Sequence, residues 1–208
     1  MSTSVAPRTS HLLYLHGFRS SPQSAKALMV AQRVREQHPG VVWCCPQLPP
    51  SPREATALMR SLTDGWPSEG MAVIGSSLGG FYARWLSLQQ GCRAALLNPA
   101  PFPQRDLKKY IGEHPVWQNP QEHIFFRAEF VGELETLADD IDQRAPQTPA
   151  TPDRLFALVS EQDEVLDWHE MMAFCAGGDI RRLPEGDHAI GDFEQHLDTL
   201  MHFLRLQG

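Results

Sequence analysis

The sequence predicts an α/β fold: a mostly parallel sheet of about six strands flanked by helices, in a single domain that spans residues 1–208. Short apolar runs alternate with longer segments of helical period, as expected for strands joined by helical crossovers. The 208-residue chain is 42% hydrophobic and 21% charged, which is typical of a globular domain large enough to bury a sizeable core.

Six short runs are the candidate strands. They are residues 12–15, 41–44, 71–74, 94–97, 155–159 and, more weakly, 179–183. Four amphipathic segments between or after these runs are the candidate helices, at about 24–37, 51–62, 78–90 and 193–206. Ser24 is a favoured N-cap, Pro52 suits a first helical turn and Gly91 is a typical stop.

Residues of about 101–152 interrupt this alternation. The segment contains Trp117, Phe125, Phe126 and Phe130 and ends in a proline-rich stretch. An excursion of this length between two strands is usually a functional loop, a lid or a small insertion, and we expect a helical or loop insertion here. Its aromatic side chains either pack it onto the body of the protein or form an apolar wall for an acyl group.

The charge and the apolar pattern argue against several classes of partner. The formal net charge is −7 without a run of basic residues, so neither nucleic acid nor an anionic membrane surface is an expected partner. An anionic small molecule stays open, because it needs only one or two local cations. No signal peptide or membrane span is predicted, and the four cysteines suit reduced thiols. The cytoplasm is the expected location.

A turn of small residues, "GSSLG" at 75–79, joins a candidate strand to a candidate helix. The pattern G-x-S-x-G exposes a serine nucleophile at the tip of a strained turn, and glycine is needed two positions before and after because side chains there would clash. Ser77 meets this condition. Ser76 does not, because Ile74 and Leu78 flank it. The pattern alone is weak, and a turn without catalysis is the alternative.

A carboxylate and a histidine follow the serine in the order that this kind of site requires. Asp163 lies in the loop after strand 155–159 and is favoured over the other acids of that loop, with Val165 turning back toward the core. His188 lies between the last strand and the last helix, where a general base for Ser77 is expected. The alternative of a metal site at Asp187-His188 lacks further ligands at a recognisable spacing, so we expect neither a metal nor an organic cofactor.

Two backbone N–H groups are expected to stabilise the oxyanion of an acyl-transfer reaction. One belongs to Leu78, directly after the nucleophile. The other is expected from Phe18, in the glycine-containing loop after the first strand, with His16 supporting that loop by hydrogen bonds. Arg19 and Ser20 are candidates for contact with an anionic part of the substrate.

Six stretches, taken in order, resemble the YqiA-type esterases, a small family of bacterial α/β-hydrolases. They are "LLYLHGFRSSPQSAKA", "CCPQLPPSP", "VIGSSLGGFYARWLS", "LLNPA", "EQDEVLDW" and "GDHAI". The resemblance spans nearly the whole chain and is weakest at about 101–152. It implies the α/β-hydrolase fold and hydrolysis of carboxylic esters, or of thioesters such as acyl-CoA. Ser77, Asp163 and His188 fall on the family's nucleophile, acid and base. Gln162 departs from the glycine that often precedes the acid.

Two other interpretations are compatible with these residues. One is a peptidase on the same Ser-His-Asp machinery, and the other is a catalytically silent hydrolase fold that acts as a binding protein. The sequence leaves open the acyl-chain length, the leaving group and the oligomeric state.

Overall fold

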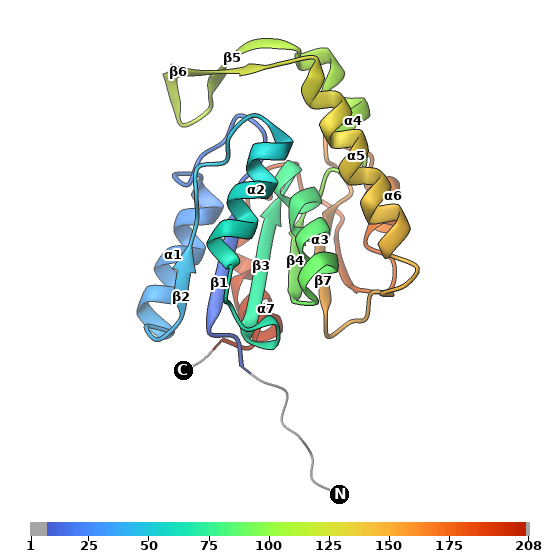
Figure 1. Cartoon of the computed structure of the whole chain (residues 1–208). Coiled ribbons are helices and arrows are strands. Elements are labelled where there is room, and N and C mark those ends of the chain that lie inside the picture. The colour runs from blue at the N-terminus through green and yellow to red at the C-terminus, as the bar shows by residue number, and fades with distance from the viewer. Residues whose placement is uncertain (1–7, 207–208) are drawn as a thin grey trace, which may run out of the picture.

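A computed structural model describes residues 8–206 and builds them around a six-stranded parallel sheet (Figure 1). The strand order is β2-β1-β3-β4-β7-β8. The strands are β1 (His11–Leu15), β2 (Val42–Cys44), β3 (Met71–Ser76), β4 (Arg93–Leu97), β7 (Leu155–Ser160) and β8 (Asp179–Leu183). All five neighbouring pairs are parallel. The predicted α/β class and all six predicted strands are confirmed.

Helices cover both faces of the sheet. They are α1 (Ala25–Gln37), α2 (Pro52–Thr63), α3 (Leu78–Gln90), α4 (Pro103–Asp106), α5 (Glu129–Arg144), α6 (Trp168–Phe174) and α7 (Leu197–Leu204). The helix predicted at 193–206 begins instead with a 3-10 turn, Phe193–His196, and α7 ends before Arg205, whose φ is 52°. Two further 3-10 turns are Ser68–Gly70 and Lys108–Tyr110.

The core consists of two apolar layers, one on each face of the sheet. Helices α1 and α7 pack with one set of strand side chains, which includes Tyr14 and Ile74. Helices α2, α3, α5 and α6 pack with the other set, which includes Leu13 and Val73. Successive side chains of a strand point to opposite faces, so a strand covered on both faces must be apolar throughout. This explains the continuous apolar runs in the sequence.

The insertion contains a β-hairpin that the sequence reasoning missed. Strands β5 (Gly112–Val116) and β6 (Asn119–Phe126) pair antiparallel between α4 and α5. The expectation of only helix and loop at 101–152 was therefore incomplete. Most of β6 is exposed, so its residues do not alternate between apolar and polar, and that alternation is the usual signal of a strand. The hairpin lies across the top of Figure 1, the end of the molecule toward which β3 points.

Within residues 8–206, no helix combines the length and the apolar character that a membrane crossing requires.

Candidate active site

Ser77 occupies a strained turn between β3 and α3. Its backbone angles are φ 55° and ψ −119°, in a region that non-glycine residues rarely adopt. A Cβ atom added at Gly75 would lie 2.7 Å from the Cβ of Ala83 and would collide with the carbonyl of Gly79. A Cβ at Gly79 would collide with the carbonyl of Leu15. Because neighbouring backbone approaches so closely at both positions, each of them must be a glycine, as the sequence pattern indicates.

The turn is also fixed from the side of β4. The Ser77 N–H donates to the Leu97 carbonyl at 3.0 Å, and the Ser77 carbonyl accepts from the Ala100 N–H at 3.0 Å. A Cβ at Gly80 would come within 2.7 Å of the Pro99 Cβ. The glycine that follows the pattern is thus explained by packing against the loop after β4.

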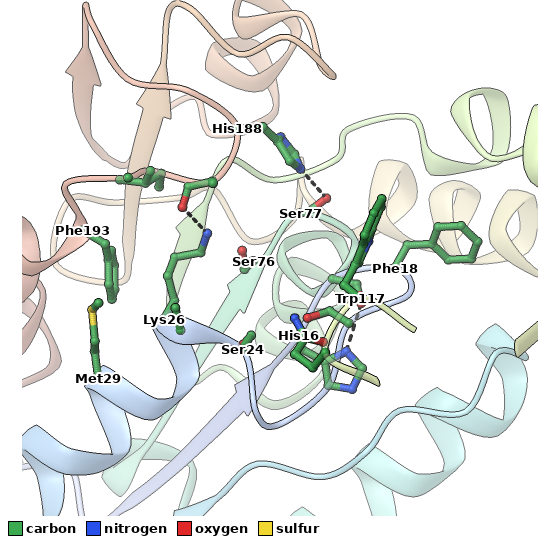
Figure 2. A pocket seen from close by; sticks show the side chains of 17 residues that line it. His16, Phe18, Ser24, Lys26, Met29, Ser76, Ser77, Trp117, His188 and Phe193 are labelled. Atoms are coloured by element: carbon green, nitrogen blue, oxygen red, sulfur yellow. Dashed lines mark hydrogen bonds between the residues drawn. The ribbon is translucent and has the colours of Figure 1, made fainter. Parts of the chain in front are cut away.

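Ser77, His188 and Asp163 form one chain of hydrogen bonds (Figure 2). The distance from Ser77 Oγ to His188 Nε2 is 3.2 Å, and the distance from His188 Nδ1 to Asp163 Oδ2 is 2.7 Å. An ionised carboxylate only accepts hydrogen bonds, so the proton of the imidazole lies on Nδ1. Nε2 is then an acceptor for the serine hydroxyl.

The Asp163 side chain is fully buried, and its second oxygen is also paired. Oδ1 accepts the N–H groups of Val165 and Leu166, each at 2.8 Å. Val165 was expected to turn toward the core, but it is 51% exposed, and Leu166 is the buried residue of this loop. The two backbone donors orient the carboxylate toward the imidazole and satisfy its buried charge.

Asn98 and Glu164 hold the His188 loop. The sequence reasoning missed Asn98 and considered Glu164 only as a less favoured alternative to Asp163 as the acid. The Asn98 amide group donates to the carbonyls of Asp187 at 2.9 Å and His188 at 3.1 Å, while its oxygen accepts the Ser160 N–H at 2.8 Å. The Glu164 carboxylate accepts the His188 N–H at 3.0 Å. The only signal for Asn98 is a polar residue directly after a buried strand.

The loop after β1 passes beside Ser77, and hydrogen bonds fix the orientation of its peptide between Gly17 and Phe18. The Gly17 carbonyl accepts from His16 Nδ1 at 2.9 Å and from the Ser20 N–H at 3.2 Å. In a trans peptide the N–H points opposite to the carbonyl, so the Phe18 N–H points away from these donors. A Cβ built on Gly17 would lie 3.2 Å from the Ser77 Cβ, which places this peptide beside the serine. Leu78 is the first residue of α3, where N–H groups have no partner within the helix.

His16 supports the loop as the sequence reasoning expected. It is 3% exposed, and its Nε2 accepts the Leu48 N–H at 3.0 Å. Burial lowers the pKa of His16, and the hydrogen bond to the Gly17 carbonyl partly opposes this shift. The imidazole is therefore favoured in its neutral form, which can donate through Nδ1 and accept through Nε2.

The hairpin is fastened to the same loop through Arg19 and Trp117. The Trp117 N–H donates to the Arg19 carbonyl at 2.8 Å, Arg19 Nε donates to the Pro115 carbonyl at 2.9 Å, and the guanidinium lies 4.0 Å from the centre of the Trp117 ring. The Phe18 ring packs against Tyr110 and Phe126. Arg19, a candidate for contact with an anionic part of the substrate, thus binds the hairpin and also lines a cavity that contains Ser77 and His188.

Two cavities meet at Ser77. The larger, about 370 Å³, is lined by residues that include Ser24, Lys26, Met29 and Ile190. The smaller, about 160 Å³, is mostly apolar and is lined by residues that include Leu78, Ala100, Leu107 and Tyr110. Phe18, Ser77, Trp117 and His188 line both.

The aromatic residues of the insertion have different surroundings. Phe126 and Phe130 are buried, Phe125 is exposed, and none of these three lines either cavity. Trp117 is the member of the expected acyl-binding wall that lines the site.

Among the residues that the structure describes, no three histidine, cysteine, aspartate or glutamate side chains are grouped in a way that would hold a metal ion.

The sequence as a whole matches a family model over residues 11–205, described as "Uncharacterised protein family (UPF0227)". The chain belongs to this family. The resemblance to the YqiA-type family is thereby confirmed. The matched range includes β1 through α7, and therefore every residue of the candidate site.

Solved structures similar to this UPF0227 member are α/β-hydrolases. Est1E from Butyrivibrio proteoclasticus, solved with bound ferulic acid, has a TM-score of 0.65 at 14% identity, over 95% of this chain and 87% of its own. Mouse α/β-hydrolase domain-containing protein 10 has a TM-score of 0.65 at 16% identity, over 96% and 92%. The esterase domain of a Rhodothermus marinus protein has a TM-score of 0.65 at 16% identity, over 97% and 89%. These likenesses show the α/β-hydrolase fold.

Gln162 departs from the glycine that often precedes the acid in YqiA-type enzymes, and the structure accommodates it. Gln162 is not among the residues with positive φ, so its side chain causes no backbone strain. Its N–H donates to the Gly186 carbonyl at 3.1 Å, which links the Asp163 loop to the His188 loop.

Proposed function

We propose that this protein is a serine hydrolase that cleaves carboxylic esters, or thioesters such as acyl-CoA, through an acyl-enzyme on Ser77. The hydrogen-bonded chain from Asp163 through His188 to Ser77 carries the proposal. It links a buried carboxylate, an imidazole of defined tautomer and a serine on a strained turn, which are the parts that activate a hydroxyl nucleophile. The α/β-hydrolase fold supports it, because this fold presents its nucleophile at such a turn.

The first step is attack of Ser77 Oγ on the substrate carbonyl. His188 Nε2 takes the hydroxyl proton as the new C–O bond forms, and Asp163 stabilises the resulting imidazolium. Collapse of the tetrahedral intermediate breaks the bond to the leaving group, and His188 returns the proton to the departing oxygen or sulfur. Water then attacks the acyl-enzyme with the same proton transfers and releases the carboxylic acid.

The N–H groups of Phe18 and Leu78 receive the oxyanion in both steps. Removing a single donor of this type costs about 10²–10³ in kcat in serine hydrolases. Both donors here belong to the backbone, so their position depends on the loop after β1 and on the start of α3. The position of Gly17 supports this role, because a Cβ added there would lie only 3.2 Å from the Cβ of Ser77.

The decisive test compares wild type, Ser77→Ala and Ser76→Ala. A fluorophosphonate probe should label wild type and Ser76→Ala, with the modified peptide carrying the probe on Ser77, and should not label Ser77→Ala. Hydrolysis of 4-nitrophenyl esters should fall about 10³-fold or more in Ser77→Ala. Undiminished turnover in purified Ser77→Ala would exclude Ser77 as nucleophile, and an unlabelled wild type would favour a binding protein.

Substrate choice is tested by a panel of acetyl to palmitoyl esters, matched acyl-CoA thioesters and peptide amides, measured on wild type and Ser77→Ala. Turnover of esters or thioesters that is lost in Ser77→Ala supports the proposal. Turnover confined to the peptides would instead identify a peptidase.

A further inference from the structure

Within residues 8–206, the larger of the two cavities at Ser77 is lined by a lysine and by no carboxylate, although the protein as a whole is acidic. Among the described residues that line this cavity, the ionisable side chains are His16, His188 and Lys26. None of these described lining residues is an aspartate or a glutamate. The chain as a whole has a net charge of −7. A lone ammonium in the lining of a cavity is a candidate partner for an anion, because low-dielectric walls strengthen the interaction between two charges.

The Lys26 ammonium is only partly paired. It donates one hydrogen bond, to the Ala189 carbonyl at 2.5 Å, although an ammonium carries three N–H donors. Among residues 8–206, no carboxylate oxygen lies within 4.0 Å of it. Burial lowers the pKa of Lys26, and the more distant carboxylates of Asp187 and Asp163 oppose this shift. An anion at the free donors would offset the cost of burying the charge.

Lys26 lies in the same cavity as the proposed nucleophile and general base. Figure 2 shows Lys26 extending from α1 into the same cavity as Ser77 and His188. The smaller cavity is mostly apolar, and its three charged residues already have partners. Arg19 lies over the Trp117 ring and Lys109 over the Tyr110 ring, while Asp106 pairs with Arg105. A substrate bound at Ser77 would therefore extend into two different surroundings.

We propose that the preferred substrate carries an anionic group, a carboxylate or a phosphate, which Lys26 binds in the larger cavity, and a small apolar group, which enters the smaller cavity. This inference rests on the proposed function, because it concerns the substrate of the Ser77 site. Lys26 is then a specificity-determining residue. Its bond to Ala189, next to His188, also positions the histidine loop.

Two pairs of esters test the proposal, each with a carboxylate in one member and the nearly isosteric amide in the other. In the first pair, 4-acetoxybenzoate and 4-acetoxybenzamide, the charge is on the leaving group. In the second pair, mono(4-nitrophenyl) adipate and the 4-nitrophenyl ester of adipamic acid, the charge is on the acyl group. Together the pairs show which half of the substrate occupies the larger cavity.

Each pair is measured on wild type, Lys26→Met, Lys26→Arg and Lys109→Met. The quantity compared is the charge preference, which is kcat/KM for the carboxylate divided by kcat/KM for the amide. Comparing this ratio between variants cancels the intrinsic reactivity of the esters and any general effect of a displaced His188 loop. Lys109→Met removes a positive charge from the smaller cavity and is the matched control.

In at least one pair, the charge preference should fall about tenfold or more in Lys26→Met, because a hydrogen bond to a charged group is lost. Lys26→Arg should keep most of it, and Lys109→Met should stay near the wild-type ratio. An unchanged ratio in Lys26→Met for both pairs would overturn the inference, as would an equal fall in Lys109→Met.

The proposed function is judged separately, from the neutral amide members alone. If wild type hydrolyses them and Ser77→Ala does not, a failure of the charge preference refutes only the inference about Lys26. If wild type hydrolyses none of the four esters but is labelled on Ser77 by the fluorophosphonate probe, only the inference fails. If it is also unlabelled, the proposed function and the inference fail together.

Discussion

Three polar side chains outside the proposed catalytic set hold the backbone around Ser77 and His188. His16 fixes the peptide between Gly17 and Phe18, while Asn98 and Glu164 fix the backbone of the histidine loop. None of the three belongs to the chain of hydrogen bonds from Asp163 to Ser77. They act by positioning, because backbone groups in irregular loops need a partner when they are buried.

Asn98 offers a sharp test of this positioning. The change Asn98→Asp keeps an oxygen for the Ser160 N–H and tolerates the φ of 42°, because aspartate also adopts left-handed backbone. It removes the amide donor from the carbonyls of Asp187 and His188. We expect the free energy of unfolding to fall by about 2–4 kcal/mol, with a parallel loss of kcat.

Urea denaturation measures that change. The exposed Asn119→Asp on the hairpin is the control and should stay within about 0.5 kcal/mol of wild type. A stability of Asn98→Asp equal to that of wild type would mean that the hydrogen bonds from the amide to the carbonyls of Asp187 and His188 contribute nothing net.

His16 predicts a pH dependence of stability. Its pKa is lowered in the folded protein, so below the ordinary value of about 6.5 the unfolded chain binds more protons than the folded one. This contribution to stability is therefore complete above about pH 6.5 and decreases as the pH falls toward the folded pKa. We expect His16→Gln to be less stable than wild type at pH 7 and to lose less stability between about pH 7 and 5.

The test is to measure the free energy of unfolding of wild type and His16→Gln across this pH range and to compare the two slopes. Equal slopes for wild type and His16→Gln would contradict a lowered pKa for His16.

At the scale of elements, the hairpin of β5 and β6 borders the site, because Trp117 at its turn lines both cavities. Its attachment to the loop after β1 consists of the contacts between Arg19 and Trp117 and of the packing around Phe18. Arg19 has a φ of 59°, a conformation that a non-glycine residue adopts only when its surroundings impose it. The hairpin and the proposed oxyanion loop are therefore coupled.

This coupling predicts the effect of truncating the hairpin aromatics. Trp117→Ala removes the ring beside Arg19 and part of the wall of both cavities. We expect kcat/KM for 4-nitrophenyl esters to fall about tenfold or more, because a cation–π contact and part of the wall that faces the substrate are lost together. The matched control is Phe125→Ala, which removes an aromatic residue that is exposed on the same hairpin and lines neither cavity. It should stay near wild type.

Steady-state kinetics with the two purified variants provides the comparison. An equal fall in Phe125→Ala would mean that the hairpin acts through its overall stability rather than through Trp117.

At the scale of the whole molecule, the parallel sheet and the hairpin differ in burial. Residues of β3 and β4 are almost all buried, whereas β6 is exposed over most of its length. A two-stranded ribbon gains little stability by itself. In native-state hydrogen exchange, the amides of β1, β3 and β4 should exchange only on global unfolding, and those of the hairpin much earlier.

Mass-spectrometric hydrogen exchange measures this directly. Protection of the hairpin equal to that of β3 would show that its attachment at Arg19 makes it part of the central cooperative unit.

The local pattern of the sequence determined the α/β class, the six strands and the turn at Ser77. These features follow from short apolar runs and from the spacing of glycines. Both are local patterns that can be recognised within a few neighbouring residues. The order of acid and histidine further identified Asp163 and His188 as candidates. Their roles as catalytic residues stay predictions for the experiments above.

Only the tertiary structure decided what surrounds these residues. Ser77 and His188 are 111 positions apart, and Arg19 and Pro115 are 96 apart. Such pairs meet because the strand order brings separate loops to one edge of the sheet, and no periodicity within either segment records that meeting. For the same reason, the lysine of the larger cavity is an ordinary helical residue in the sequence. It becomes a candidate anion site only when the fold places it beside Ser77.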